Sequence, residues 1–212
     1  MWKDPFPKAG STLSWSMKSW ASNPGNPLGG SNPPQVFGPE HLPQLDQAVH
    51  LAQDLVSEAF NLDLANFKQW PVDTRRWVDL APSELMTGVL AQVLCYRKPG
   101  VLSSQKPDFY RVCLYDPFIL AASFREDLPL LTLLTYVLTH EYIHVARFIR
   151  FLELVSLAPH LKVKEEILVH AQTKELLAGR NLIGLPKLLE LFAENRLSLD
   201  SLETLNRLTD DL

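Results

Sequence analysis

Two histidines and a glutamate form the most informative cluster in this sequence. They lie in the segment THEYIH at residues 139–144. Side chains four residues apart share one face of a helix, a turn apart, so the imidazoles of His140 and His144 could hold one Zn²⁺ at about 2.0–2.1 Å each. Glu141 is rotated by about 100° from His140, within reach of a water beside the metal. The pattern predicts a metal site and a general base on one helix.

The helix that must position these residues is expected to begin with Asp127 as N-cap and to run to about Val155. Pro129 is tolerated in a first turn, and no glycine or proline follows it in this stretch. Imidazole and carboxylate groups on an apolar core helix are costly unless something satisfies them. A metal ion would do so, and a solvated helix face is the alternative explanation.

The segment resembles the active-site helix of the zincin metallopeptidases, whose HExxH motif binds zinc through its two histidines. The resemblance covers the five motif residues and their helical setting. It implies that His140 and His144 are zinc ligands and that Glu141 is the catalytic base. It also implies an edge strand that lines the substrate cleft, for which Phe109–Tyr115 is the candidate.

A catalytic zinc takes a third protein ligand, and the resemblance indicates where to look for it. The metzincin subclass would require Gly and His three and six residues after His144, where this chain has Arg147 and Arg150. Gluzincins use a glutamate from the next helix, some twenty or more residues on. Twenty-one residues lie between His144 and Glu166, which is similar to the gluzincin arrangement.

Glu165 and Glu166 cannot both face one metal, because neighbouring helical residues point about 100° apart. Glu166 shares a face with His170, one turn later, and this resembles the gluzincin layout in which the later residue supports a ligand. We expect Glu166 to be the third ligand, with His170 and Glu165 as supporting residues or alternative ligands. An acidic first turn that complements the helix dipole is the ordinary explanation for the glutamates. The Glu-Glu-x-x-Val-His stretch also resembles uncharacterised bacterial zincin-like proteins.

The remaining patterns predict an α+β fold, mostly helical, in which a zincin-like core combines a small sheet with a long active-site helix. Period-two alternation indicates a strand at 109–115. Apolar spacing of three to four residues indicates helices from about His41 to Phe60 and from Val163 to Ala178. We also expect a helix from Ser83 to Tyr96, and two more near 186–196 and 198–208.

The first forty residues differ in composition from the rest of the chain. They are rich in Pro, Gly, Ser and Asn, so we expect residues 1–40 to be an extended or disordered tail and 41–212 to be the metallopeptidase domain. The tail carries isolated aromatic residues that could dock on a partner or on the protein's own cleft. These are Trp2, Phe6, Trp15 and Trp20.

Composition limits the class of protein. The 212 residues are 46% hydrophobic and 21% charged, with a net charge of −4, as in an ordinary globular protein. Without a basic cluster or a long apolar run, we expect neither a nucleic-acid nor a membrane partner. Cys95 and Cys113 are expected to be buried thiols, although they could pair, and the expected location is the cytoplasm.

The predicted function is that of a zinc-dependent peptidase with one Zn²⁺. Glu141 would act as general base, and a peptide or protein substrate would lie extended along the sheet edge. Two alternatives remain open, a non-catalytic zinc-binding scaffold and a peptide-binding regulatory protein. The sequence specifies neither the cleavage preference nor the oligomeric state.

Overall fold

The computed structural model describes residues 13–18, 35–62, 72–96, 109–151 and 158–193. In chain order, its elements are β1 (Leu13–Lys18), α1 (Leu42–Phe60), β2 (Val72–Arg76), two 3₁₀ turns (Trp77–Asp79 and Pro82–Glu84), β3 (Val89–Tyr96), β4 (Phe109–Leu114), α2 (Asp116–Arg125), α3 (Leu130–Arg150) and α4 (Pro159–Leu177). Residues 185–193 are also helical. The fold is therefore α+β and mostly helical, as predicted.

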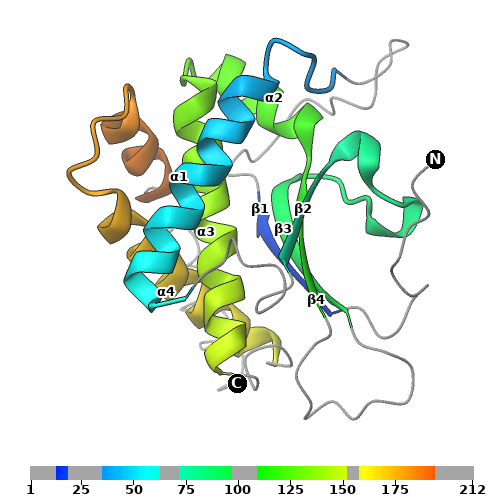
Figure 1. The fold of residues 1–212 in the computed structure, drawn as a ribbon, viewed down its shortest axis with the longest axis vertical. Coiled ribbons are helices and arrows are strands. Elements are labelled where there is room, and N and C mark those ends of the chain that lie inside the picture. Colours follow the sequence, from blue (N-terminus) through cyan, green and yellow to red (C-terminus); the bar gives the residue numbers. More distant parts are fainter. Residues whose placement is uncertain (1–12, 19–34, 63–71, 97–108, 152–157, 194–212) are drawn as a thin grey trace, which may run out of the picture.

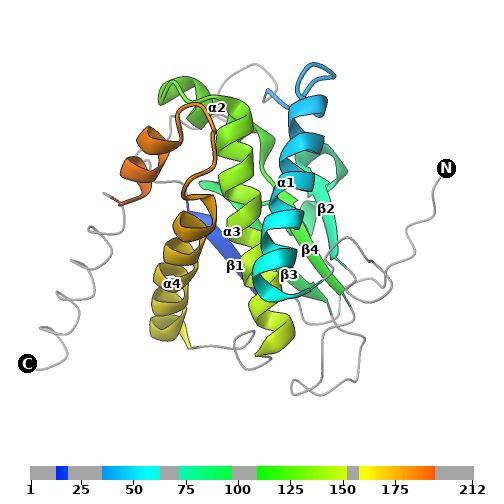
Figure 2. The same ribbon diagram turned by 60° about the vertical axis from the view of Figure 1, so that its left-hand side comes forward.

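Four strands form one mixed sheet in the order β1-β3-β4-β2. β3 is antiparallel to both β1 and β4, whereas β2 is parallel to β4. The helices α1, α3 and α4 lie on one side of the sheet (Figure 1), and α3 lies between the other two (Figure 2). After rotation, the β1 edge of the sheet is on the α4 side and the β2 edge is on the α1 side (Figure 2).

The helix α3 is the centre of the core. Every residue from Thr132 to Ala146 is buried, which is expected of a helix that is apolar on nearly all sides. One polar contact joins it to the sheet, because the Tyr142 hydroxyl lies 2.9 Å from Oγ1 of Thr74 on β2. The apolar face of α1 packs along α3. The central helix therefore contacts the sheet on one side and α1 and α4 on its two flanks.

The predicted helix from Ser83 to Tyr96 is wrong. Residues Val89–Tyr96 form β3, and only a short 3₁₀ turn precedes it. Both faces of this strand are covered, since all eight of its residues are buried. A strand that is buried on both faces lacks the alternation of a half-exposed strand and cannot be told from a buried helix by periodicity.

The start of the central helix also differs from the prediction. Asp127 adopts a left-handed conformation with φ of 47°, and the N-cap position belongs to Pro129. The helix ends at Arg150, before the predicted Val155. The strand ends before Asp116, as expected, but this residue begins the unpredicted helix α2.

The strand predicted at 109–115 is β4, but it pairs with β3 on one side and β2 on the other, so it is not the edge strand that the resemblance to zincins implies. Other helices are confirmed or lie outside the described residues. The helices at 41–60 and 163–178 correspond to α1 and α4, although α4 begins four residues earlier at Pro159. The proposed helix at 198–208 lies outside the described residues. Within the described ranges, no helix is long and apolar enough to cross a lipid bilayer.

Candidate metal centre

The two histidines of the motif lie side by side on the α4-facing side of α3. Their side chains are almost completely buried, and their Nε2 atoms are 3.1 Å apart. The rings meet nearly edge to face, with centroids 4.8 Å apart and an interplanar angle of 73°. Because four residues complete about one helical turn, α3 alone brings both imidazole nitrogens to one point.

Glu166 of α4 brings a carboxylate to the same point. Its Oε2 lies 3.2 Å from Nε2 of His140, and its Oε1 lies 3.3 Å from Nε2 of His144. Among the described residues, His140, His144 and Glu166 are the only group of three or more metal-binding side chains whose ligand atoms converge in this way. The structure thus brings together the three residues that the sequence analysis chose as ligands.

The spacing of these atoms fits a tetrahedral ion. Zinc bonds of about 2.0–2.1 Å place the ligand atoms of a regular tetrahedron roughly 3.3 Å apart. The two Nε2 atoms are 3.1 Å apart, and each lies 3.2–3.3 Å from one oxygen of the Glu166 carboxylate, Oε2 for His140 and Oε1 for His144, so each of these separations is close to that value. Two imidazole nitrogens and one carboxylate are also the ligand types of many catalytic zinc sites. The residues present therefore fit one Zn²⁺.

Burial, neighbouring charges and hydrogen bonds together set the ionisation of His140 and Glu166. Burial lowers the pKa of His140, and the charge of His144 lowers it further, against an opposing effect of Glu166. Burial alone would raise the pKa of Glu166, but the charge of His144 and hydrogen bonds with both imidazoles bring it well below its usual range. A neutral imidazole and an ionised carboxylate are the forms that bind a metal.

Glu141 directly follows His140 in α3 but is not one of the three residues whose ligand atoms converge. Its side chain is fully buried. Burial raises the pKa of the Tyr115 hydroxyl, and the nearby charge of Glu141 contributes to the same shift. In α3 the Glu141 side chain is rotated by about 100° from that of His140, so it adjoins a proposed ligand without being one, as a general base requires.

Glu165, the alternative glutamate, points elsewhere. Its two carboxylate oxygens accept hydrogen bonds from Arg147 at 2.5 and 2.8 Å, in a buried two-pronged ion pair. The interaction ties α4 to α3 one turn beyond His144. Glu165 therefore stabilises the contact between the two helices that carry the metal-binding side chains.

His170 packs against the site from the next turn of α4. Its ring centroid is 4.4 Å from that of His140, and its Nδ1 lies 2.9 Å from the hydroxyl of Tyr136. Phe192 stacks on Tyr136 with centroids 4.2 Å apart. Phe192 was not predicted as a residue of the site. It follows His144 by forty-eight residues, and no local pattern indicates that its helix packs against Tyr136.

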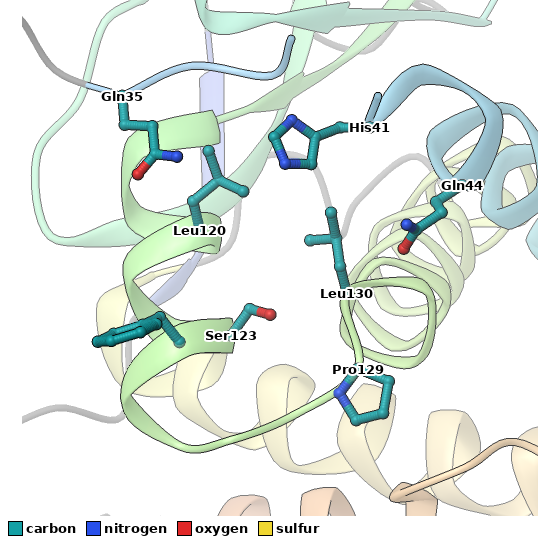
Figure 3. A pocket seen from close by; sticks show the side chains of 8 residues that line it. Gln35, His41, Gln44, Leu120, Ser123, Pro129 and Leu130 are labelled. Carbon is teal, nitrogen blue, oxygen red and sulfur yellow. The ribbon is translucent and has the colours of Figure 1, made fainter. Parts of the chain in front are cut away.

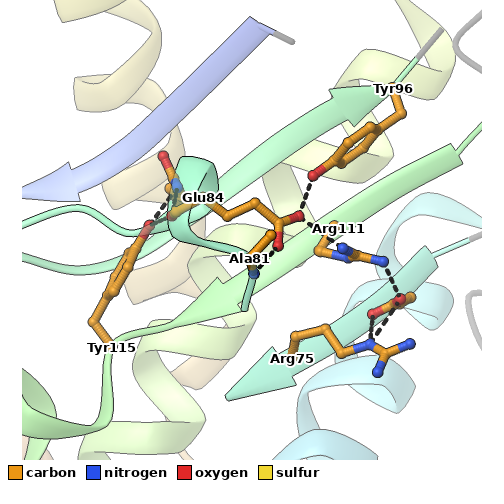
Figure 4. Close-up of polar contacts among 8 residues, drawn as sticks. Arg75, Ala81, Glu84, Tyr96, Arg111 and Tyr115 are labelled. Atoms are coloured by element: carbon orange, nitrogen blue, oxygen red, sulfur yellow. Dashed lines mark hydrogen bonds and ion pairs between the residues drawn. The ribbon is translucent and has the colours of Figure 1, made fainter. Parts of the chain in front are cut away.

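A buried ionic network lies on the other face of the sheet (Figure 4). Arg111 of β4 donates hydrogen bonds to Glu84 at 2.7 Å and to Asp73 at 3.1 Å, and the Tyr96 hydroxyl donates to Glu84. Alternate residues of a strand face opposite sides. Since Thr74 contacts α3, Asp73 and its partner Arg111 face away from the metal-binding side chains. This network belongs to the fold and not to the site.

A surface pocket of about 550 Å³ is likewise separate from the metal-binding residues. It lies where α1 and α3 begin and α2 ends, and Leu130 is one of its walls (Figure 3). Ten residues of helix separate Leu130 from His140, which corresponds to about 15 Å. The metal-binding side chains therefore lie outside this pocket.

Comparison of the chain with protein-family models, with curated proteins and with solved structures found no match.

Proposed function

We propose that the chain is a zinc-dependent peptidase, in which His140, His144 and Glu166 hold one Zn²⁺ and Glu141 is the general base. One observation carries the proposal. The Nε2 atoms of the two histidines are 3.1 Å apart, and each lies 3.2–3.3 Å from one oxygen of the Glu166 carboxylate. The buried Glu141 directly follows His140 in the same helix. The resemblance of the motif to zincins agrees with this arrangement.

The chemistry divides between the ion and the protein. A bound Zn²⁺ would supply Lewis acidity, which lowers the pKa of a water toward neutrality and polarises a carbonyl. Glu141 takes the proton from the attacking water and then delivers it to the leaving amine. Its burial keeps bulk water from competing for that proton. The substrate in this proposal is an extended peptide or protein segment, and the cytoplasm remains the proposed location.

The Glu141→Gln variant tests the catalytic part of the proposal. The amide cannot accept a proton, and general-base assistance is typically worth about 10²–10⁴-fold in rate. Cleavage of a broad peptide library should therefore collapse while zinc content and melting temperature hold. Equal cleavage by wild type and variant would rule out Glu141 as the base.

A non-catalytic zinc site is the second candidate, and the burial of the site favours it. His140, His144 and Glu141 are all at most 1% exposed, and structural zinc sites are closed to solvent. His170 lies beside His140, with ring centroids 4.4 Å apart, and is the candidate for a fourth ligand. Zinc that binds fully with four protein ligands, and a library that neither protein cleaves, would favour this candidate.

A further inference from the structure

The strand β1 covers one edge of the sheet. It pairs antiparallel with β3, with Ser14 opposite Leu94 and Ser16 opposite Gln92. Seventy residues of chain lie between Lys18 and Val89, so β1 reaches this edge from far away in the sequence. Its only strand neighbour in the described sheet is β3. An edge strand with a single neighbour is held by one ladder of backbone hydrogen bonds.

This edge lies on the side of the sheet where the metal-binding side chains are. α4, which carries Glu166, and β1 lie on the same side of α3 (Figure 2). The two histidines face Glu166 of α4. Of the two edges of the described sheet, β1 and β2, the β1 edge is the one on the α4 side. A peptide that aligns on the sheet next to the metal-binding side chains would therefore use the edge that β1 covers.

The sequence of β1 is that of an ordinary extended peptide. Its residues LSWSMK alternate apolar and polar types, and it adds to the sheet through its main chain. Strand addition of this kind draws its affinity from backbone hydrogen bonds that any extended segment can form. A substrate and β1 would consequently compete for the same backbone groups of β3.

We propose that β1 is an autoinhibitory strand, which occupies the edge of β3 on which an extended peptide substrate pairs and which must leave before substrate binds. The inference rests on the proposed peptidase function. It adds a regulatory element to that function and names the backbone of β3 as the surface that recognises substrate. The Pro/Gly/Ser-rich composition of residues 19–34 fits a tether between β1 and the domain.

The size of the effect follows from competition within one chain. A tethered segment acts at an effective concentration on the order of 1 mM. If β1 itself has a dissociation constant of about 0.1 mM for the vacant edge, it covers that edge roughly ten times as often as it leaves it vacant. An added peptide would then bind the intact protein roughly tenfold more weakly. Releasing β1 should recover that factor without any change in the metal-binding residues.

The first test uses a fluorescent peptide with the sequence of residues 11–20, added to the full-length Glu141→Gln protein. In an antiparallel strand, alternate residues direct their N–H groups toward the neighbour, so the Ser14→Pro/Trp15→Pro pair removes one ladder donor whichever residue carries it. Fluorescence anisotropy should show about tenfold tighter binding to this variant. The Ala9→Pro/Gly10→Pro control, in the same tail, should match the parent protein.

The second test locks β1 in place. Leu13 pairs with Cys95, which is a thiol, and paired Cα atoms of antiparallel strands lie about 4.5–5.5 Å apart, within disulfide range. Oxidised Leu13→Cys should no longer bind the peptide, and reduction should restore binding. The Leu13→Cys/Cys95→Ala variant should not respond to oxidation.

The outcomes separate this inference from the proposed function. Equal peptide affinity in the proline variant and its parent, or unchanged binding to the locked strand, would overturn the autoinhibitory role. Cleavage of the peptide library by locked wild-type protein would do the same while leaving the peptidase intact. Faster cleavage by the proline variant supports both. If peptide affinity rises in the proline variant and is lost in the locked variant, but no variant cleaves the library, β1 is a displaceable strand and the proposed peptidase function is ruled out.

Discussion

One carboxylate, that of Glu166, lies within 3.2–3.3 Å of the Nε2 atoms of both His140 and His144. The glutamate and the histidines belong to different helices, so the convergence depends on how α4 docks on α3. The buried ion pair of Arg147 with Glu165 fixes that docking. Glu165 therefore stabilises the contact between the helices, whereas Glu166 is a proposed ligand. Substituting each glutamate should affect a different property.

Replacing either glutamate tests this division. Glu166→Ala should weaken zinc affinity by more than the roughly 10–100-fold typical of losing an outer-shell partner, because a direct ligand is removed. Glu165→Ala should keep the metal but destabilise the protein by about 3–5 kcal/mol, because it leaves Arg147 buried without its carboxylate. Competition with a zinc-binding dye and thermal unfolding measure the two effects. A reversed pattern would show that Glu165 is the ligand.

The contact between Tyr136 and His170 should support the site. Tyr136→Phe keeps the stacking on Phe192 but loses the hydrogen bond to His170, which should cost about 0.5–1.5 kcal/mol of stability. His170 packs on His140, so zinc affinity should also fall, by up to about tenfold.

Tyr142→Phe is the matched control for this change. It loses a hydrogen bond of the same length to Thr74 and one to Gln53, both away from the metal-binding side chains. Its stability should fall by a similar amount, while its zinc affinity should not change. Equal zinc affinities in the two tyrosine variants would show that His170 does not support the site.

The buried network around Glu84 should make the fold sensitive to acid. Burial opposes ionisation of Glu84, but hydrogen bonds from Tyr96 and Arg111 and the charge of Arg111 bring its pKa below the usual 4.5. A carboxyl group with a lowered folded-state pKa contributes stability that is present above its unfolded pKa and is lost as the pH falls through the folded pKa.

The comparison of Glu84→Gln with wild type as a function of pH tests this. At neutral pH the variant should be less stable by about 3–5 kcal/mol, since it leaves Arg111 with a broken ion pair. The difference should shrink below pH 4.5, measured by urea unfolding at a series of pH values. A difference that stayed constant down to pH 3 would contradict the lowered pKa.

The helix that carries the motif was predictable from the sequence because it combines a long run free of glycine and proline with a fixed four-residue spacing. The convergence of Glu166 was anticipated only through the resemblance to gluzincins, since spacing within one helix says nothing about how two helices dock. The roles of Glu165 and Phe192 depend on tertiary contacts with Arg147 and Tyr136, which leave no local signal.

The sheet was harder to predict for a different reason. β3 is covered on both faces and lacks alternation, so its apolar residues fit a buried helix equally well. β2 has the polar sequence VDTRR, and its pairing with β4 is parallel and distant in sequence. β1 does show alternation, as LSWSMK, but it lies in a segment whose Pro/Gly-rich composition favours disorder over a strand. The division of the chain at residue 40 remains a prediction.

Metal analysis of the purified full-length protein tests the central claim most directly. Wild type should contain about one Zn²⁺ per chain at neutral pH, and His144→Ala should contain almost none, because the remaining side chains cannot complete the site. His50→Ala, which removes a histidine from α1, should match wild type. Wild type that takes up no zinc, or a His144→Ala variant that keeps it, would contradict the account.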